Sequence, residues 1–194
     1  PNGFLPNALA KGADEQVRFD ELDAWNERPE EGVRYFSGRA TYRKSVKLGD
    51  EMLRAVGKGG RIVLDLGNVR ELAQVTANGK AFDALWRPPF RLDVTEAVKG
   101  DRLDLEITVA NLWANRLIGD DRQFAPDCEW KGEVVRGVKE IGIREIPAWV
   151  KDGKPSPTGR HTFTTWKHWD KDDELLPSGL LGPVRLRTVV RCQS

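Results

Sequence analysis

The feature that most constrains the fold is a strict alternation of apolar and polar residues over residues 102–110. Single polar residues separate four apolar ones: Leu103, Leu105, Ile107 and Val109. Successive side chains of a β-strand point to opposite faces of a sheet, so this pattern predicts a strand with one buried face. The same period of two occurs in two earlier segments, at Ile62, Leu64 and Leu66 and at Ala73, Val75 and Ala77.

Turn signals connect these segments into antiparallel pairs. Asn78 and Gly79 both tolerate the positive φ angles of a type I′ turn, which predicts a hairpin at this point. Pro88 and Pro89 cannot donate hydrogen bonds to a sheet and therefore interrupt the next segment. Further strands are predicted within residues 35–48, 90–100, 158–169 and 180–190. Strands at short spacing without long helices predict an all-β fold, an antiparallel β-sandwich or jelly roll.

The predicted organisation is one sandwich domain with a lead-in segment and a long insert. The lead-in covers residues 1–33 and the domain covers residues 34–194. Residues 112–158 lose the alternation and are expected to form a loop insert with one short helix near residues 146–153. Trp113 continues the inward parity of the preceding strand and is expected in the core. The other predicted core residues are Ile62, Leu64, Val75, Leu105, Ile107, Val109 and Phe163.

The charge balance and the termini argue against several classes of protein. Lys and Arg number 31 against 30 Asp and Glu, a net charge of +1 that is scattered along the chain, which disfavours nucleic acid and membrane surfaces as partners. No apolar stretch approaches the ~18 residues that cross a bilayer. The first residues lack both an initiator Met and the features of a signal peptide, which is typical of a processed protein or of a piece of a longer chain.

Few residues are suited to catalysis or metal binding. Cys128 and Cys192 are the only cysteines, which excludes a thiolate zinc site, whereas a disulfide between them stays open. His161 and His168 are seven residues apart, which is no metal-ligand spacing. Carboxylates are plentiful, but each lies in a polar segment where solvated charge is the simpler interpretation: Asp120 and Asp121, Asp127 and Glu129, and Asp170, Asp172, Asp173 and Glu174.

Several segments, in order, resemble a known family. They are GRATYRKSVKL, RIVLDLGNVRELAQVTANGKAFD, PPFRLDVTEAVKGDRLDLEITVANLW and GLLGPVRL, over about residues 34–113 and 179–190. This order is similar to the sugar-binding jelly roll of family 2 glycoside hydrolases, a galactose-binding-like fold. The segments NLWANRLIGDD, SPTGRHTFTTWKHW and LLPSGLLGPVRL, with the Pro-Ala-Trp region between them, resemble the C-terminal region of bacterial family 106 α-L-rhamnosidase-like enzymes.

The resemblance implies a non-catalytic β-sandwich attached to a catalytic barrel in a secreted or periplasmic bacterial enzyme that degrades polysaccharides. The catalytic carboxylates of such enzymes belong to the barrel, which has no counterpart in this chain, so we expect no turnover by the chain alone. No cofactor is required. Sandwiches of this type often carry a structural Ca²⁺, which loop carboxylates and backbone carbonyls could bind here, although no EF-hand-type spacing supports it.

Aromatic and polar residues at strand ends are the candidate carbohydrate contacts. A Trp ring can stack on the apolar face of a sugar while neighbouring polar groups bind its hydroxyls. The candidates are Trp86, Arg87, Asn115, Arg116, Trp166, Lys167, His168 and Trp169. For Trp86, Trp166 and Trp169, the alternatives to sugar contact are docking against a partner domain and plain packing at the ends of the sandwich.

Two hypotheses of function follow. The first is a carbohydrate-binding module that holds a plant or algal polysaccharide near a catalytic domain. The second is a structural accessory domain that packs on the catalytic barrel without sugar affinity of its own. A cleft lined by exposed Trp, Arg and His would favour the first, and an exposed apolar patch would favour the second.

Overall fold

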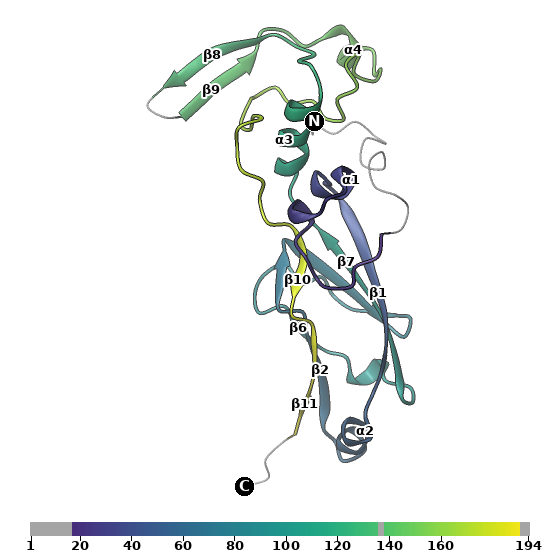
Figure 1. Cartoon of the computed structure of the whole chain (residues 1–194). Coiled ribbons are helices and arrows are strands. Elements are labelled where there is room, and N and C mark those ends of the chain that lie inside the picture. The colour runs from purple at the N-terminus through teal and green to yellow at the C-terminus, as the bar shows by residue number, and fades with distance from the viewer. Residues whose placement is uncertain (1–16, 136–137, 191–194) are drawn as a thin grey trace. The chain divides into compact units, whose positions relative to one another are not determined.

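A computed structural model describes residues 17–135 and 138–190 of the chain. Strands that pair antiparallel make up most of its regular structure, together with a few short helices (Figure 1). The described residues form two compact units. The sheet unit comprises residues 19–24, 38–112 and 177–190, and the loop unit comprises residues 17–18, 25–37, 113–135 and 138–176.

The larger sheet of the sheet unit has four strands in the order β1-β7-β4-β5. Their bounds are Arg39–Lys47 (β1), Arg102–Ala110 (β7), Leu72–Ala77 (β4) and Lys80–Ala81 (β5). The register places Tyr42, Ile107 and Val75 in one row across the sheet. The four alternating residues of β7 are nearly or fully buried, so the predicted inward face of this strand is confirmed.

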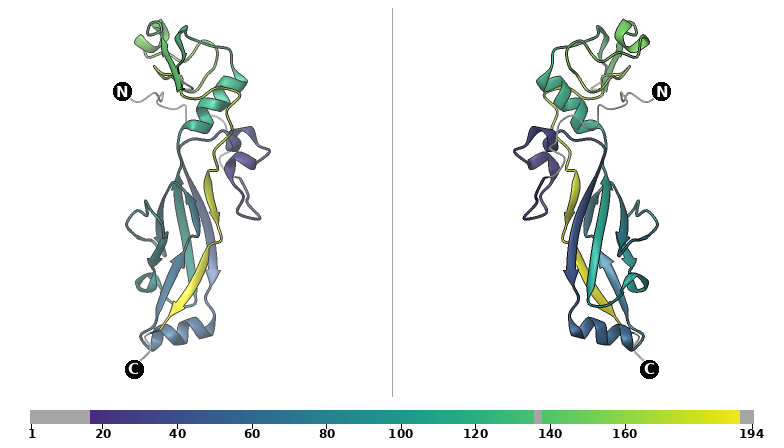
Figure 2. Two further views of the ribbon diagram at one scale, coloured as in Figure 1. Left: turned by 90° about the vertical axis from the view of Figure 1, so that its left-hand side faces the viewer. Right: turned by 90° about the vertical axis from the view of Figure 1, so that its right-hand side faces the viewer.

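Two smaller sheets complete the sheet unit. One has the order β11-β2-β6, with bounds Arg185–Val189 (β11), Arg61–Asp65 (β2) and Arg91–Asp93 (β6), and β11 and β2 run side by side in Figure 2. The other pairs β10 (Gly179–Gly182) with β3 (Asn68–Arg70). Ile62, Leu64 and Leu66 are fully buried, as the alternation predicts. A Cβ on Gly67 would lie 2.4 Å from the carbonyl carbon of Gly182, so a side chain has no room where these two segments meet.

The Asn-Gly turn is confirmed between β4 and β5. Asn78 has φ 45° and Gly79 has φ 79°, the left-handed conformation that this turn requires. The Asn78 side chain also donates to the carbonyls of Ala97 and Arg102 at 3.0 and 3.1 Å and accepts from the Asp104 N–H at 2.8 Å. The turn therefore anchors the start of β7 to the 3-10 helix η3 (Thr95–Ala97).

The helix α2 (Asp50–Gly57) of the sheet unit was not expected from the alternation. Two residues separate it from the end of β1, and it has no buried residue, so strand periodicity carries no signal for it. Asp50 and Glu51 lie in its first turn, where acidic side chains favour helix formation.

The loop unit contains short elements joined by long loops. They are the 3-10 helix η2 (Trp25–Glu27), α1 (Glu31–Arg34), α3 (Ala114–Gln123), the hairpin β8 (Trp130–Val135) and β9 (Val138–Ile143), and α4 (Ala148–Lys151). The short helix expected near residues 146–153 is confirmed by α4. Within the described residues, no helix is both long and apolar enough to cross a membrane.

Three expectations for this region are wrong. Trp113 is 38% exposed because α3 begins directly after it and the parity of β7 does not continue. Residues 158–169 form no strand, although Trp166 makes a single bridge to Gly142 of β9. Phe163 is only half-buried and packs edge-on against Trp149, with ring centroids 5.6 Å apart, in the loop unit.

Candidate functional site

A buried ion pair organises the loop unit. Asp120 of α3 is fully buried, and its Oδ2 accepts hydrogen bonds from the N–H groups of His161 and Thr162 and from the Thr162 hydroxyl, at 2.9, 2.7 and 2.7 Å. Its Oδ1 lies 3.0 Å from Nε of Arg116, one helical turn earlier, although this contact lacks the alignment of a hydrogen bond. One carboxylate therefore ties α3 to the segment that begins at residue 161.

Arg116 is held from several sides. Its guanidinium lies over the Tyr35 ring, 5.5 Å from the centroid, and Nη2 donates to Oε1 of Gln123 at 2.8 Å. Burial lowers the pKa of Arg116, and the charge of Asp120 opposes this effect. The contacts join α1, its following residues and α3 into one packed group.

The next carboxylate in the chain, Asp121, forms ion pairs with two basic side chains. Its Oδ1 lies 3.2 Å from Nη2 of Arg160, and its Oδ2 lies 3.2 Å from Nζ of Lys167 and accepts from the Lys171 N–H at 3.1 Å. Most of the surface of the Asp121 and Arg160 side chains is buried. Asp121 thus anchors two further loop segments to the end of α3.

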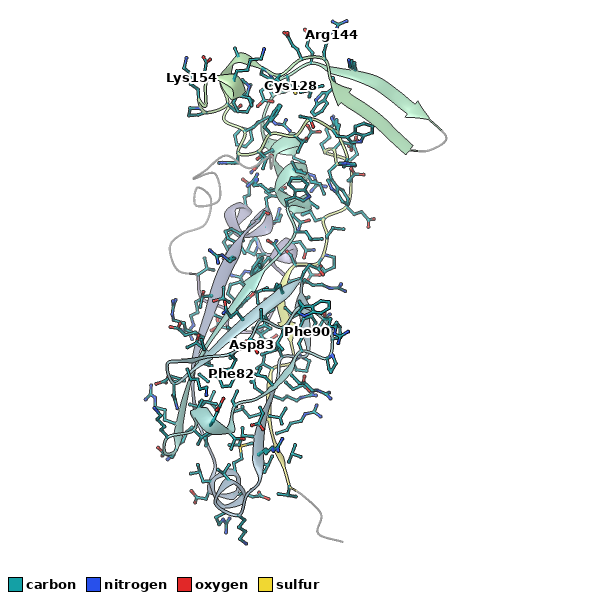
Figure 3. The ribbon with its side chains drawn as sticks, turned by 180° about the vertical axis from the view of Figure 1, so that it is seen from behind. Phe82, Asp83, Phe90, Cys128, Arg144 and Lys154 are labelled. Atoms are coloured by element: carbon teal, nitrogen blue, oxygen red, sulfur yellow. The ribbon has the colours of Figure 1, made fainter. Side chains whose placement is uncertain are left out.

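Asp127, which directly precedes the free thiol of Cys128, is the third carboxylate of this network. Its Oδ2 accepts from the Ser156 hydroxyl at 2.7 Å, and its Oδ1 lies 3.9 Å from Nε of Arg160. Cys128 lies where the chain approaches the hairpin that ends near Arg144 (Figure 3). Burial and the neighbouring charge of Asp127 raise the pKa of Cys128 to about 11, so the thiol is protonated at neutral pH. Cys192, with which the sequence left a disulfide open, lies outside the described residues.

The interpretation of these carboxylates as solvated charges is therefore wrong for Asp120, Asp121 and Asp127. Each is largely or fully buried and already engaged by cations, hydroxyls or backbone N–H groups. Such a network fixes loops that have little apolar core between them. The i, i+4 spacing of Arg116 and Asp120 is the signal that could have indicated this pair, had residues 114–123 been recognised as a helix.

Two of the predicted carbohydrate contacts, Asn115 and Arg116, are buried. Asn115 donates to the carbonyl of Leu176 and accepts from its N–H, both at 2.8 Å. Arg116 has the partners described above. Their polar groups are directed into the loop unit, so neither residue is retained in the proposals below.

The four predicted contacts at residues 166–169 have different surroundings in the structure. Residues 165–167 pair with β9, since the Ile143 N–H donates to the carbonyl of Thr165 and the Lys167 N–H donates to that of Ile141. Trp166 and His168, two positions apart, have ring centroids 5.9 Å apart, and both are exposed. The Lys167 side chain instead forms an ion pair with Asp121. Trp169 is half-buried. We call the pair of exposed rings the Trp166–His168 surface.

Trp86 and Arg87 belong to the sheet unit. They lie in the loop that contains Phe82, Asp83 and Phe90, whose side chains Figure 3 labels. Trp86 is 68% exposed, and the Arg87 guanidinium lies over its indole at 5.0 Å from the ring centroid. One face of the indole is therefore covered by Arg87.

Trp86 is part of a small apolar patch. Ala73 and Leu85 exchange two backbone hydrogen bonds, which places Trp86 opposite Leu72 on the outer face of the sheet. Leu72 is 37% exposed. We call Leu72 and Trp86 the Trp86 patch.

No metal cluster is evident in the described parts of the chain. No three His, Cys, Asp or Glu side chains there are grouped so that they could hold a metal ion, and this leaves the expected Ca²⁺ without a proposed position. A surface hollow over β1 and β7 is lined largely by charged side chains, Arg43, Lys44, Arg102, Asp104 and Glu106, and includes no aromatic ring.

Comparisons with known proteins place the chain within longer ones. No family model matches it. Over 175 residues, 90% of the chain, it is 46% identical to a Formosa agariphila protein provisionally named a beta-glucuronidase, of which it spans 14%. A rhamnosidase structure from Novosphingobium sp. PP1Y matches 95% of the chain with a TM-score of 0.67 and 31% identity, and the chain again spans 14% of that protein. A beta-D-glucuronidase structure from Dictyoglomus thermophilum matches 54% of the chain and 18% of its own, with 21% identity and a TM-score of 0.43.

Proposed function

We propose that this chain is a non-catalytic module of a larger glycoside hydrolase and that it packs on the catalytic domain of that enzyme. The observation that carries the proposal is the extent of the two matches: 90% and 95% of this chain correspond to only 14% of longer proteins that are named glycosidases. Most of each such protein lies outside the matched region. The catalytic carboxylates would then lie on another part of the enzyme.

We also propose that the fold is a galactose-binding-like β-sandwich with an insert. Two antiparallel sheets of the sheet unit each bury one apolar face, which is the arrangement a sandwich needs. The loop unit would be the insert, with the region from residue 113 to residue 176 in place of the expected 112–158. By the same family resemblance, we propose a secreted or periplasmic location.

The Trp86 patch supports packing on the catalytic domain. Exposed apolar side chains that gather on one face mark interaction surfaces. Trp86 is 68% exposed and Leu72 is 37% exposed in this chain. Aromatic residues are also enriched at the centres of protein interfaces. We therefore assign the Trp86 patch to the contact with the rest of the enzyme.

The test introduces Trp86→Glu both in the isolated chain and in the parent enzyme. Because Trp86 is exposed, we expect the isolated chain to unfold at the same temperature as wild type, while the parent enzyme unfolds at a lower temperature. Thr76→Glu, a half-buried position on the same outer face of β4, is the matched control in the parent enzyme. Equal unfolding temperatures for wild-type and Trp86→Glu parent enzymes would contradict packing through this patch.

A carbohydrate-binding module is the second candidate, and the Trp166–His168 surface favours it. Two neighbouring exposed rings offer aromatic surface on which the apolar face of a sugar could stack. Trp166→Ala should then weaken glycan binding by the isolated chain, as measured by calorimetry or on a glycan array, with circular dichroism to confirm folding. Equal binding by the folded variant and by wild type would remove Trp166 from the site.

A further inference from the structure

The outer face of the sheet β11-β2-β6 is rich in arginine. Leu64, Leu92 and Leu186 form one row in the register and mark the inner face. The outer face therefore consists of the residues of opposite parity: Arg61, Val63, Asp65, Arg91, Asp93, Arg185, Arg187 and Val189. Four arginines against two aspartates give this face a formal charge of +2, in a chain whose total charge is +1. We call it the arginine face.

Asp65 organises the centre of the arginine face. It lies between Arg185 and Arg91 in the register, and its side chain is 8% exposed. Its Oδ2 accepts from Nε of Arg91 at 2.9 Å and lies 3.3 Å from Nη2 of Arg187. A hydrogen bond from the Gly67 N–H and the two guanidinium groups keep the pKa of Asp65 below its usual range, so the carboxylate is charged at neutral pH.

One carboxylate cannot satisfy the arginines around it. Arg91 uses Nε for Asp65 and so keeps both terminal nitrogens for another acceptor. Arg187 is 48% exposed, and no ion pair of Arg185 occurs within the described residues. Arg61 is 64% exposed, and its nearest carboxylate, Asp93, lies at 3.6 Å. Asp65 thus holds the guanidinium groups of Arg91 and Arg187 in position and leaves several of their N–H donors for another acceptor.

We propose that the arginine face is a binding surface for a saccharide chain that carries carboxylate or sulfate groups. A guanidinium presents two parallel N–H donors that match the oxygens of either group. Arg185, Arg187 and Arg91 lie on the two strands that flank Asp65, so their donors surround one position on the sheet. Because Asp65 already orders two of the three side chains, binding loses less conformational entropy than it would with free arginines.

The composition of the face favours a saccharide over a protein partner. The fully buried centre of a protein interface is mainly apolar and rich in aromatic residues. On this face, the described residues include no aromatic ring, and Val63 and Val189 are its only apolar members. Polar donors spread over a flat sheet suit a ligand whose own surface is hydroxyl and anionic groups. The choice of a saccharide among anions rests on the proposed place of the chain in a glycoside hydrolase.

The test measures binding of the isolated chain to three polymers: polygalacturonate with carboxylates, dextran sulfate with sulfates, and neutral dextran. We expect wild type to bind at least one of the acidic polymers, more weakly as ionic strength rises, and not to bind neutral dextran. Arg185→Gln with Arg187→Gln should weaken that binding roughly tenfold or more. The matched control, Arg43→Gln with Lys47→Gln, removes the same charge from exposed positions of β1 in the other sheet and should bind as wild type does.

Three results would overturn the inference: no binding to either acidic polymer at low salt, equal binding by wild type and Arg185→Gln with Arg187→Gln, or an equal loss in the control pair. The third would mean that only the net charge matters. Which acidic polymer binds distinguishes a carboxylate from a sulfate ligand. Failure here is separate from failure of the proposed function, since catalytic turnover and unfolding of the parent enzyme are measured independently of polymer binding.

Discussion

Replacing Asp120 with Ala is the perturbation whose effect the structure defines best. The change removes a fully buried carboxylate and leaves three hydrogen-bond donors, the N–H groups of His161 and Thr162 and the Thr162 hydroxyl, without their acceptor. It also leaves the buried Arg116 guanidinium without the carboxylate that lies 3.0 Å from its Nε. The loop unit therefore loses its main link between α3 and the segment that follows residue 160.

Breaking a buried ion pair by removing one partner costs about 3–5 kcal/mol, chiefly because the remaining charge stays buried and uncompensated. We expect Asp120→Ala to lower the free energy of unfolding of the loop unit by that amount. Asp120→Asn keeps the volume and one acceptor oxygen, so it should cost less. The full loss is a large fraction of the ~5–15 kcal/mol that stabilises a typical domain.

Tryptophan fluorescence during urea denaturation is the suitable assay. Six of the seven tryptophans lie in the loop unit, and only Trp86 belongs to the sheet unit. Fluorescence therefore reports mainly on the loop unit, whereas far-ultraviolet circular dichroism reports on both units. Asp172→Ala, in an exposed position of the loop unit, is the control and should change stability by no more than about 0.5 kcal/mol. A loss below about 1 kcal/mol in Asp120→Ala would refute the assignment of Asp120 as the organising residue.

Three further predictions concern the core, the acid stability and the thiol. Ile107→Ala should cost about 2–5 kcal/mol in urea denaturation followed by circular dichroism, because Ile107 is 4% exposed in the centre of β7; an unchanged midpoint would contradict its burial. The pKa of Asp65 is lower in the folded chain than its ordinary value of 3.8, so the charged carboxylate stabilises the fold above about pH 3.8. This stabilisation is lost as the pH falls through the pKa of the folded state, so the stability of Asp65→Asn should decline less steeply in acid than that of wild type. Cys128, with its pKa near 11, should react with iodoacetamide at pH ~8 far more slowly in the folded chain than in urea, as mass spectrometry of its peptide would show; equal rates would contradict the raised pKa.

The strands of the sheet unit were predictable because burial on one face imposes a period of two. Leu103 and Val109 are fully buried at the two ends of one alternating run, and Asn78 has the backbone conformation that its turn requires. The same rule gave a wrong result for Trp113. Parity has no meaning beyond the end of a strand, and α3 begins one residue later.

The loop unit was not predictable from periodicity because its backbone is held by side chains. Residues 161 and 162 donate their N–H groups to Asp120 rather than to a neighbouring strand, so a segment of strand-like composition stays irregular. Such contacts span about forty residues of sequence and leave no local pattern.

The candidate site was only partly predictable for a similar reason. Asn115 and Arg116 have the residue types of a sugar site, but they lie on a helix that directs their side chains into the loop unit. Trp166 and His168 were candidate sugar contacts with packing as the alternative for Trp166, and their rings lie 5.9 Å apart in the structure.

Hydrolysis of aryl glycosides by the purified chain tests the proposed non-catalytic role most directly. Aryl rhamnosides, galactosides and glucuronides release a coloured or fluorescent product, so even slow turnover is measurable. We expect no release above the rate in buffer, because the buried carboxylates of the loop unit are engaged by cations and hydrogen bonds. Saturable turnover that disappears when a single carboxylate of this chain is replaced would contradict it.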